Sequence, residues 1–385
     1  MNMSQDFYRY LCQKYPKLQD EALENDMAAN LLSPFQVHLP VGLKTEVLQT
    51  IEAFQKLRES PAYQSWIEKK WGSQFNPGNH SLFMSYDFHV TPEKELKLIE
   101  INTNASFLGL GWEMFQFLNI PWNADFQLPD LKSCLLQEMQ LASYSQPLSK
   151  IVITDEAPSQ QKLYLEFVYF REFFKTLGFD CEIADVRDKD KLQSAQLIYN
   201  RTTDFYLEEE PNQFLKDLYQ NRSAVLSPNP YEYRLLADKE NFVAWSDSSF
   251  WEQVPLEISV RNQINKVLLK TQYLTEENKD DIWSQRKQLF FKPKRAFGSK
   301  SAYKGASISR KVFDDLLKNQ CLAQEWVAAP EVEFETEKGK ESFKYDLRCY
   351  AYGSQFQGCV ARLYQGQVTN LRTENGGFAA VLFQN

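Results

Sequence analysis

The chain has 385 residues, 43% of them hydrophobic and 24% charged, so it can bury a large core and is expected to form two or three lobes. Its formal net charge of -8 argues against a nucleic-acid partner, because nucleic-acid binders usually present a basic face. Six cysteines without CxxC spacing and only three histidines argue against a zinc site. The N-terminus does not resemble a signal peptide, and no apolar run approaches the length of a membrane span, so we expect a cytoplasmic protein with no membrane partner.

The first 80 residues are expected to be helical. Val47, Ile51 and Phe54 recur at helical spacing, and a further short helix is predicted to end at Gly72. Residues 81–90 then alternate as a strand, residues 91–95 turn, and residues 96–102 return as a second strand. The two strands are expected to pair as a hairpin.

From residue 150 the pattern changes to strand, helix and strand, followed by another strand that ends near residue 200. Parallel sheets bind ligands at the carboxyl ends of their strands. We therefore expect Asn200, Arg201 and Thr203 to bind a substrate carboxylate. An ordinary ion pair between Arg201 and Asp204 is the alternative.

Two prolines near residue 229 indicate a crossing between lobes, and residues 256–289 are expected to be mainly polar helix. From residue 289 the chain is rich in strands. The stretch FFKPKRAFGSKSAYKG combines a strand-end Lys292 with a loop containing Gly298, Ser299 and Lys300. Such a loop can offer amide and ammonium groups to phosphate oxygens. A solvated basic hairpin is the alternative interpretation.

The stretch AQEWVAAPEVEF follows the basic loop. Gln324, Glu325 and Val327 lie where a strand enters a linker, and the exposed backbone of such a segment can pair with an adenine edge. Glu331 follows at a distance that suits a ribose hydroxyl. By itself, this pattern is also that of an ordinary edge strand.

Further along, Asp346 and Arg348 share one face of a strand by the period of two. Arg362 and Arg372 are candidate catalytic residues that would neutralise charge developing during phosphoryl transfer. Surface ion pairs are the alternative for these arginines.

The stretch KLIEINTNAS delivers a carboxylate and amides to the end of a strand. Asp87, Glu100 and Asn102 form a set of hard oxygen ligands that suits magnesium and does not suit zinc or copper. A polar strand end capped by turn hydrogen bonds is the alternative.

Together, the strand FFKP, the loop AFGSKSAYKG, the segment QEWV, the strand DLR and the pair E-x-N resemble the ATP-grasp superfamily. The E-x-N pair here precedes FFKP, an order similar to the circularly permuted branch that includes the synthetase domain of glutathionylspermidine synthase. That branch often has an arginine two positions before the aspartate, where this chain has Ser85. The resemblance leaves Arg362 or Arg372 to supply its role.

The resemblance implies an α/β fold, with the nucleotide between two ATP-grasp lobes and a Rossmann-like pre-ATP-grasp substrate lobe, in circularly permuted order. The implied divisions are a helical region at 1–80, metal-ligand strands at 81–148, the substrate lobe at 149–230 and the nucleotide lobes at 231–385.

It also implies an ATP- and Mg2+-dependent carboxylate-amine ligase that forms an amide bond through an acyl phosphate. Lys239 and Lys292 would be the two nucleotide-binding lysines, and the loop from Ala296 to Gly305 would close over the phosphates. The expected partners are small molecules: a carboxylate such as an amino acid or short peptide, and an amine. An ATP-binding regulatory module without ligase activity and an ATP-grasp phosphotransferase are the alternatives.

Overall fold

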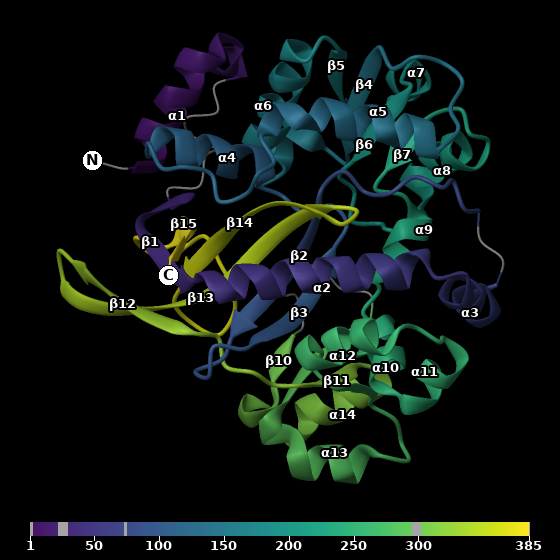
Figure 1. Cartoon of the computed structure of the whole chain (residues 1–385), viewed down its shortest axis with the longest axis vertical. Coiled ribbons are helices and arrows are strands. Elements are labelled where there is room, and N and C mark those ends of the chain that lie inside the picture. The colour runs from purple at the N-terminus through teal and green to yellow at the C-terminus, as the bar shows by residue number, and fades with distance from the viewer. Residues whose placement is uncertain (1–2, 22–29, 73–74, 295–301, 385) are drawn as a thin grey trace.

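The computed structural model describes residues 3–21, 30–72, 75–294 and 302–384, which form three sheets with helices packed around them (Figure 1). The central sheet has the strand order β1-β15-β14-β13-β2-β3, with β12 paired to β13. Its strands are β1 (Leu32–Pro40), β2 (Met84–Val90), β3 (Leu96–Asn102), β12 (Glu331–Thr336), β13 (Gly339–Tyr352), β14 (Gln355–Tyr364) and β15 (Gly377–Gln384). One sheet thus joins the N-terminal strands to the C-terminal ones.

The predicted hairpin is confirmed as antiparallel β2 and β3, with Asp87 opposite Glu100. On the other side of β2, Asp87 lies opposite Arg348 of β13. One strand further, Asp346 of β13 lies opposite Arg362 of β14. The register of four neighbouring strands therefore brings these charged residues together.

The expectation that the first 80 residues are all helical is wrong for residues 32–40, which form β1 and pair in parallel with β15. Val37 and Leu39 are buried and His38 between them is exposed, which is the period of two of a half-buried strand. The flanking segments are helical as predicted, as α1 (Met3–Lys14), α2 (Val41–Glu59) and α3 (Pro61–Trp71). Helix α2 runs across the middle of the molecule in Figure 1.

A smaller parallel sheet, ordered β5-β4-β6-β7, lies above the central one in Figure 1. It contains β4 (Lys150–Asp155), β5 (Asp180–Asp185), β6 (Leu197–Asn200) and β7 (Val225–Ser227). Its surrounding helices are α4 (Leu108–Phe117), α5 (Leu131–Leu141), α6 (Tyr164–Thr176), α7 (Lys189–Gln193) and α8 (Gln213–Gln220). The predicted strand-helix-strand unit is therefore confirmed as β4, α6 and β5.

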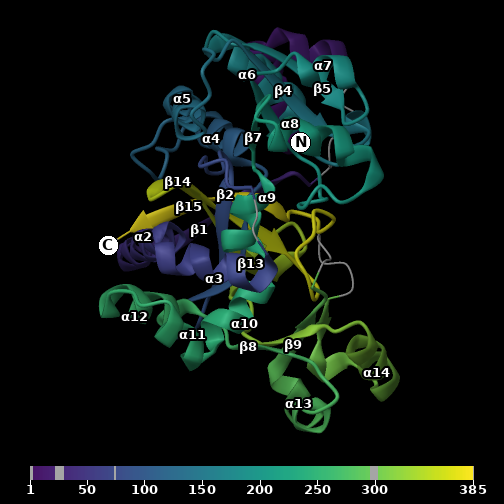
Figure 2. The same ribbon diagram turned by 90° about the vertical axis from the view of Figure 1, so that its right-hand side faces the viewer.

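The third sheet is antiparallel, ordered β10-β9-β11-β8, and hangs below the central sheet to one side (Figure 2). Its strands are β8 (Thr271–Tyr273), β9 (Leu289–Lys292), β10 (Tyr303–Lys304) and β11 (Leu322–Glu325). Helices precede and surround it: α9 (Pro230–Glu232), α10 (Glu240–Ser246), α11 (Ser248–Gln253), α12 (Ile258–Val267), α13 (Lys279–Gln285) and α14 (Arg310–Lys318). Residues 256–289 are mainly helical as expected.

The lower lobe has an apolar core of its own, which includes Leu289, Phe291 and Phe313. The central sheet and most of the upper helices share one large core, and a second small cluster lies on the other face of the parallel sheet. Within the described part of the chain, no helix combines the length and the apolar character that a membrane crossing requires.

Two glycines with positive φ allow a test of packing on the strand that carries Arg362. A Cβ built on Gly358 (φ +138) would lie 1.9 Å from Trp122 Cζ2, whereas one on Gly366 (φ +102) would meet nothing within 4 Å. We expect Gly366→Ala to lower the free energy of unfolding by about 1–3 kcal/mol, because only the backbone is strained by a side chain at positive φ. Gly358→Ala should cost a further ~1–3 kcal/mol because it also overpacks the core. Denaturant unfolding measures both variants, and equal losses would contradict this packing.

Candidate functional site

The carboxylate of Asp87 is buried and accepts five hydrogen bonds from described residues. Arg348 donates from Nε to Oδ1 (3.1 Å) and from Nη2 to Oδ2 (2.7 Å). Arg362 Nη2 donates to Oδ2 at 2.9 Å. The Ser85 hydroxyl donates to Oδ1 (3.0 Å) and Asn102 Nδ2 to Oδ2 (3.2 Å). A carboxylate offers about four lone-pair sites, so Asp87 is saturated.

Electrostatics keep Asp87 ionised. Burial opposes its ionisation, but Arg348 and Arg362 outweigh the burial and hold the pKa below the usual range. Arg362 also donates from Nε to Asp346 Oδ1 at 2.6 Å, and Asp346 accepts from Thr369 Oγ1 at 2.5 Å. Burial works against the charge of Arg362, yet Asp346 and Asp87 raise its pKa. Asp346 and Arg348 thus lie in one network, as their spacing of two predicted.

Asn102 lies between the two acids of the hairpin. Its Nδ2 is 3.2 Å from Asp87 Oδ2 and 3.3 Å from Glu100 Oε1. A donor between two carboxylate oxygens marks a position that favours positive charge, and turning the amide would present its oxygen there instead. Glu100 and Asn102 are only partly buried. This donor set fits Mg2+, which needs only one or two carboxylates beside phosphate and water ligands.

Two lysines from the lower lobe face Glu100. Lys292, at the end of β9, donates from Nζ to the carbonyl oxygen of Ile99 at 2.9 Å. Burial lowers the pKa of Lys292 to about 8, although Glu100 opposes the shift. Lys239 immediately precedes α10, and burial lowers its pKa too, again opposed by Glu100. A buried lysine whose pKa is lowered by desolvation suits phosphate oxygens, because an anion that arrives with a ligand stabilises the ammonium form.

The cluster combines cations with carboxylates. The cations are Lys239, Lys292, Arg348 and Arg362, and the carboxylates are Asp87, Glu100, Asp346 and, beside Lys239, Asp238. Because burial lowers the pKa of both lysines in spite of these acids, an anionic ligand beside them would stabilise their charge. Among the described residues, no three His, Cys, Asp or Glu side chains group as a metal site, so the predicted set depends on the amide of Asn102.

The predicted adenine segment lies beside the lysine strand. Gln324 is buried on β11, pairs with Phe290 of β9 and donates from Nε2 to Thr271 Oγ1 at 3.2 Å. Glu325 uses its carboxylate to accept from the Lys270 backbone amide at 3.0 Å.

Two further predicted nucleotide residues lie beyond β11. The carbonyl oxygen of Val327 is 3.3 Å from His89 Nδ1, which ties this linker to β2. Glu331 is exposed at the start of β12, where its carboxylate accepts from Ser342 at 3.2 Å. Gln324 and Val327 are thus near the lysine strand and β2, while Glu331 points to solvent on the β12 arm.

Gly298, Ser299 and Lys300 of the basic loop lie outside the described residues. The strands that flank them, β9 and β10, pair as a hairpin, and Lys304 Nζ lies 3.7 Å from the ring centre of Trp326.

Arg372 is exposed, and its backbone amide donates to Asn370 Oδ1 at 2.9 Å. Within the described chain no hydrogen bond joins its guanidinium to the Asp87 network.

The three predicted substrate residues have different surroundings. Asn200 is buried, and its Oδ1 accepts from the amide (3.0 Å) and hydroxyl (2.8 Å) of Thr202. Thr203 is exposed. Arg201 is largely buried and donates from Nη1 to the carbonyl oxygen of Asn104 at 2.5 Å. Only Arg201 therefore directs a charged group toward the end of β3.

Two acids beside Arg201 were not predicted as site residues. Glu166 on α6 has its pKa raised to about 7 by burial, which Arg201 partly offsets. Asp155 ends β4, and burial raises its pKa to about 6. The strand-end rule that selected Asn200 also applies to Asp155. Glu166 carries no such signal, because it lies within a helix of mostly apolar residues.

Comparison with known proteins concerns the fold. No protein-family model and no curated protein matches the chain. Among solved structures, it is similar to a glutathione synthetase-like effector (GSS30) from Globodera pallida in the apo form, with a TM-score of 0.60 and 12% identity over 98% of this chain and 97% of that one. The predicted α/β class is confirmed by the three sheets with helices packed around them, and the chain shares the overall fold of this glutathione synthetase-like effector. The permuted order remains a prediction.

Two further similarities are weaker. A candidate gamma-glutamylcysteine synthetase from Methylobacillus flagellatus KT has a TM-score of 0.44 and 10% identity over 86% of this chain and 84% of that one. D-cycloserine synthetase DcsG has a TM-score of 0.35 and 12% identity over 60% of this chain and 90% of that one. These scores are too low to support a structural inference.

The Asp87 network allows a stability test. Asp87→Asn leaves the buried Arg348 without its anion, so we expect a loss of about 3–5 kcal/mol in the free energy of unfolding. Glu374→Gln is the control, because it breaks an ion pair with Lys338 in which both side chains are more than half exposed. The control should change stability by less than ~0.5 kcal/mol. Similar small losses in both variants, measured by urea unfolding, would show that Asp87 is not buried between the arginines.

Proposed function

We propose that the chain is an ATP-dependent carboxylate-amine ligase. The observation that carries the proposal is the convergence of Glu100 and Asn102 from the hairpin with Lys239 and Lys292 from the lower lobe. Two oxygen ligands and two desolvated lysines are the groups that a magnesium-bound triphosphate needs. The fold likeness to a glutathione synthetase-like protein supports the proposal.

In the proposed reaction a substrate carboxylate oxygen attacks the γ-phosphorus of ATP, and ADP leaves. The nitrogen of a neutral amine then attacks the acyl carbon of the acyl phosphate. Inorganic phosphate leaves with the C–O bond electrons and takes up the proton that the amine nitrogen loses. Lys239 and Lys292 hold the phosphates, and Arg362 neutralises charge on the transferred group, with Asp346 orienting its guanidinium. We propose the same role for Arg372, which is exposed between β14 and β15.

Mg2+ would be held by Glu100 and Asn102, with Asp87 as a third ligand, and when bound it would neutralise phosphate charge. Coordination by Asp87 requires that one of its five donors leaves, and Asn102 is the donor that belongs to the same ligand set.

We further propose that Gln324, Glu325 and Val327 line the adenine site and that Glu331 contacts the ribose. The basic loop with Gly298, Ser299 and Lys300 would cover the phosphates. Residues 149–230 would hold substrate through Asn200, Arg201 and Thr203.

One observation favours a second candidate, an ATP-binding module without ligase activity. The place of the arginine common in the resembling branch is taken by Ser85, and Arg348 and Arg362 are both bound to Asp87 instead. If both arginines stay there, neither is available for transferred phosphate. A phosphotransferase that stops after the first step would use the same groups and needs no amine.

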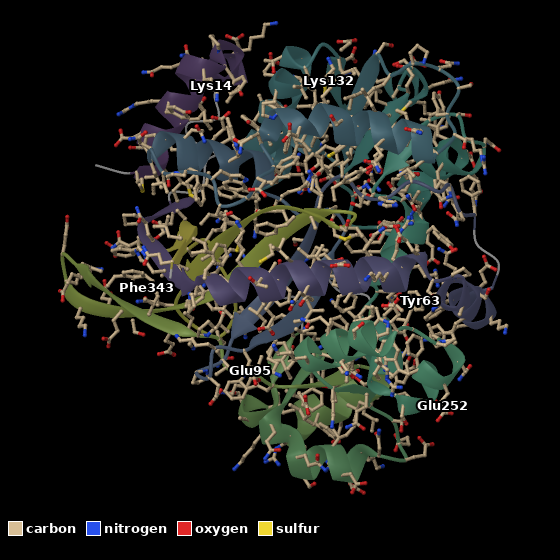
Figure 3. All side chains as sticks on the ribbon, in the orientation of Figure 1. Lys14, Tyr63, Glu95, Lys132, Glu252 and Phe343 are labelled. Atoms are coloured by element: carbon tan, nitrogen blue, oxygen red, sulfur yellow. The ribbon has the colours of Figure 1, made fainter. Side chains whose placement is uncertain are left out.

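Magnesium-dependent nucleotide binding tests the site. We expect calorimetry to show ATP binding that requires Mg2+, and Glu100→Gln to weaken it by roughly tenfold or more, since a charged ligand is lost. Glu95→Gln is the matched control on the same hairpin, because Glu95 is exposed in the turn between β2 and β3 (Figure 3). ATP binding that is unchanged in Glu100→Gln would contradict the metal site.

Turnover separates the three activities in the same preparation. A ligase releases ADP and phosphate only when both a carboxylate and an amine are supplied. A phosphotransferase releases ADP with one acceptor and yields a phosphorylated product that is stable in water. A binding module binds ATP with magnesium and releases no ADP with any pair.

The pKa of Lys292 predicts a pH dependence. Burial favours the neutral amine, so above pH 8 the ligand-free protein loses the ammonium that would bind phosphate. We expect the ATP affinity to fall with rising pH above this value, by up to about tenfold per pH unit. Lys292→Arg keeps its charge at alkaline pH and should remove the dependence. Titrations on both sides of pH 8 measure the effect, and an equal fall in Lys292→Arg would assign it to another group.

A further inference from the structure

The guanidinium of Arg201 has one satisfied edge and one open edge. Nη1 donates to the Asn104 carbonyl at 2.5 Å and to the Tyr199 hydroxyl at 3.2 Å. Nε is buried and has no hydrogen-bond partner among the described residues. Nη2 lies 4.0 Å from Glu166 Oε2, which is too far for a hydrogen bond. The Nε/Nη2 edge is the one that binds a carboxylate with two parallel bonds.

In two other buried arginines, both donors of this edge are hydrogen-bonded to a carboxylate. Arg58 donates from Nε and Nη2 to Glu232 Oε2 at 3.0 and 2.8 Å. Arg348 donates from the same two atoms to Asp87 at 3.1 and 2.7 Å. Arg201 has the buried acid Glu166 beside it and yet makes no hydrogen bond to it.

Contacts on both sides keep the Arg201 and Glu166 pair apart. Glu166 Oε1 accepts from the backbone amide of Phe107, which precedes α4. The opposite side of Arg201 is held by the Asn104 carbonyl. Glu166 Oε2 is buried and has no hydrogen-bond partner in the described part of the chain. A buried donor, Arg201 Nε, and a buried acceptor, Glu166 Oε2, are thus both unsatisfied among the described residues, which is costly unless a ligand or water completes them.

Asp155 adds a second acid to the same place. It ends β4, next to the strand that delivers Arg201, and the Arg201 backbone amide donates to the Thr154 carbonyl at 2.8 Å. Its charge lies close enough to Arg201 to affect the pKa of both groups. Two carboxylates and one guanidinium with an open edge match a ligand that carries one anion and one cation.

We propose that Arg201, Glu166 and Asp155 bind the α-amino acid end of a substrate. The open edge of Arg201 takes the α-carboxylate, and the two acids take the α-ammonium. The group that reacts is then not the α-carboxylate but lies further along the molecule. The substrate class is an α-amino acid, or a peptide linked through its side chain, with a second carboxylate or amine away from the α-carbon.

The position of the Arg201 cluster relative to the phosphate site fits such a substrate. Glu100 lies near the end of β3 and close enough to Lys292 to affect its pKa, and two residues beyond the strand the backbone carbonyl of Asn104 accepts from Arg201. Arg348 is near enough to Glu166 to lower its pKa. The interpretation of the Arg201 cluster as a substrate site rests on the proposed ligase function, but the binding of a ligand through two charges is testable without it.

Direct binding to the full chain tests the inference. The probes are L-glutamate, L-aspartate, L-lysine and L-ornithine, titrated by calorimetry with and without magnesium and a non-hydrolysable ATP analogue. We expect at least one to bind, and its α-carboxamide and its N-acetyl derivative each to bind roughly tenfold or more weakly, because each lacks one charge. These derivatives test the wild-type protein and need no variant.

Variants then assign the two charges. Arg201→Met should weaken binding of the amino acid by roughly tenfold or more. Glu166→Gln should reduce the preference for the free amino acid over its N-acetyl derivative. ATP binding should stay unchanged in both variants. Arg222→Met, which removes an exposed guanidinium from the same lobe, is the control. No binding of any probe, equal binding of the derivatives, or equal binding to Arg201→Met would overturn the inference.

The two proposals fail separately. If magnesium and ATP bind and no probe does, the amino acid site is wrong and the nucleotide site stands. If a probe binds through both charges and ATP does not bind, the ligase proposal is wrong and the amino acid site stands.

Discussion

The bridge made by the Asp87 carboxylate is the interaction on which the central sheet and the proposed site depend. It joins β2 to β13 through Arg348 and to β14 through Arg362, while Asn102 connects it to β3. Buried charges of this kind are costly to desolvate and stabilise a structure only when every partner is present. The bridge therefore requires one register of four strands, and that register also places Glu100 beside the lysines.

The lower lobe contacts the central sheet through Lys292, whose buried ammonium is costly to desolvate in the ligand-free protein. Lys292 donates to the backbone carbonyl of Ile99, and burial lowers its pKa, so its charge is only partly compensated by the described residues around it. Arg201 in the upper lobe is similar, because its buried Nε has no hydrogen-bond partner among the described residues. Local departures from full satisfaction are typical of functional sites, where the missing partner arrives with the ligand. Lys292 and Arg201 thus each carry a charge that the surrounding described residues compensate only in part.

Much of the local structure was predictable because it depends on short-range pattern. The β2–β3 hairpin follows from alternation on each side of a polar turn, and the strand-helix-strand unit follows from the change from a period of two to helical spacing. Strand β1 was missed because its alternation covers only Val37 to Leu39 and its stability comes from β15, far away in the sequence. Glu166 was missed because a lone acid in an apolar helix has no pattern that marks it.

The sequence by itself determined which chemistry the chain carries: hard oxygen ligands at the end of one strand, a lysine at the end of another, and an arginine after a third. Only the tertiary structure decided which of these meet. Arg348 and Arg362 reach Asp87 across strands more than 250 residues later in the chain, and Lys292 reaches Ile99 from another lobe. Such contacts depend on strand register and lobe packing, which are set by the whole buried core and not by any local spacing.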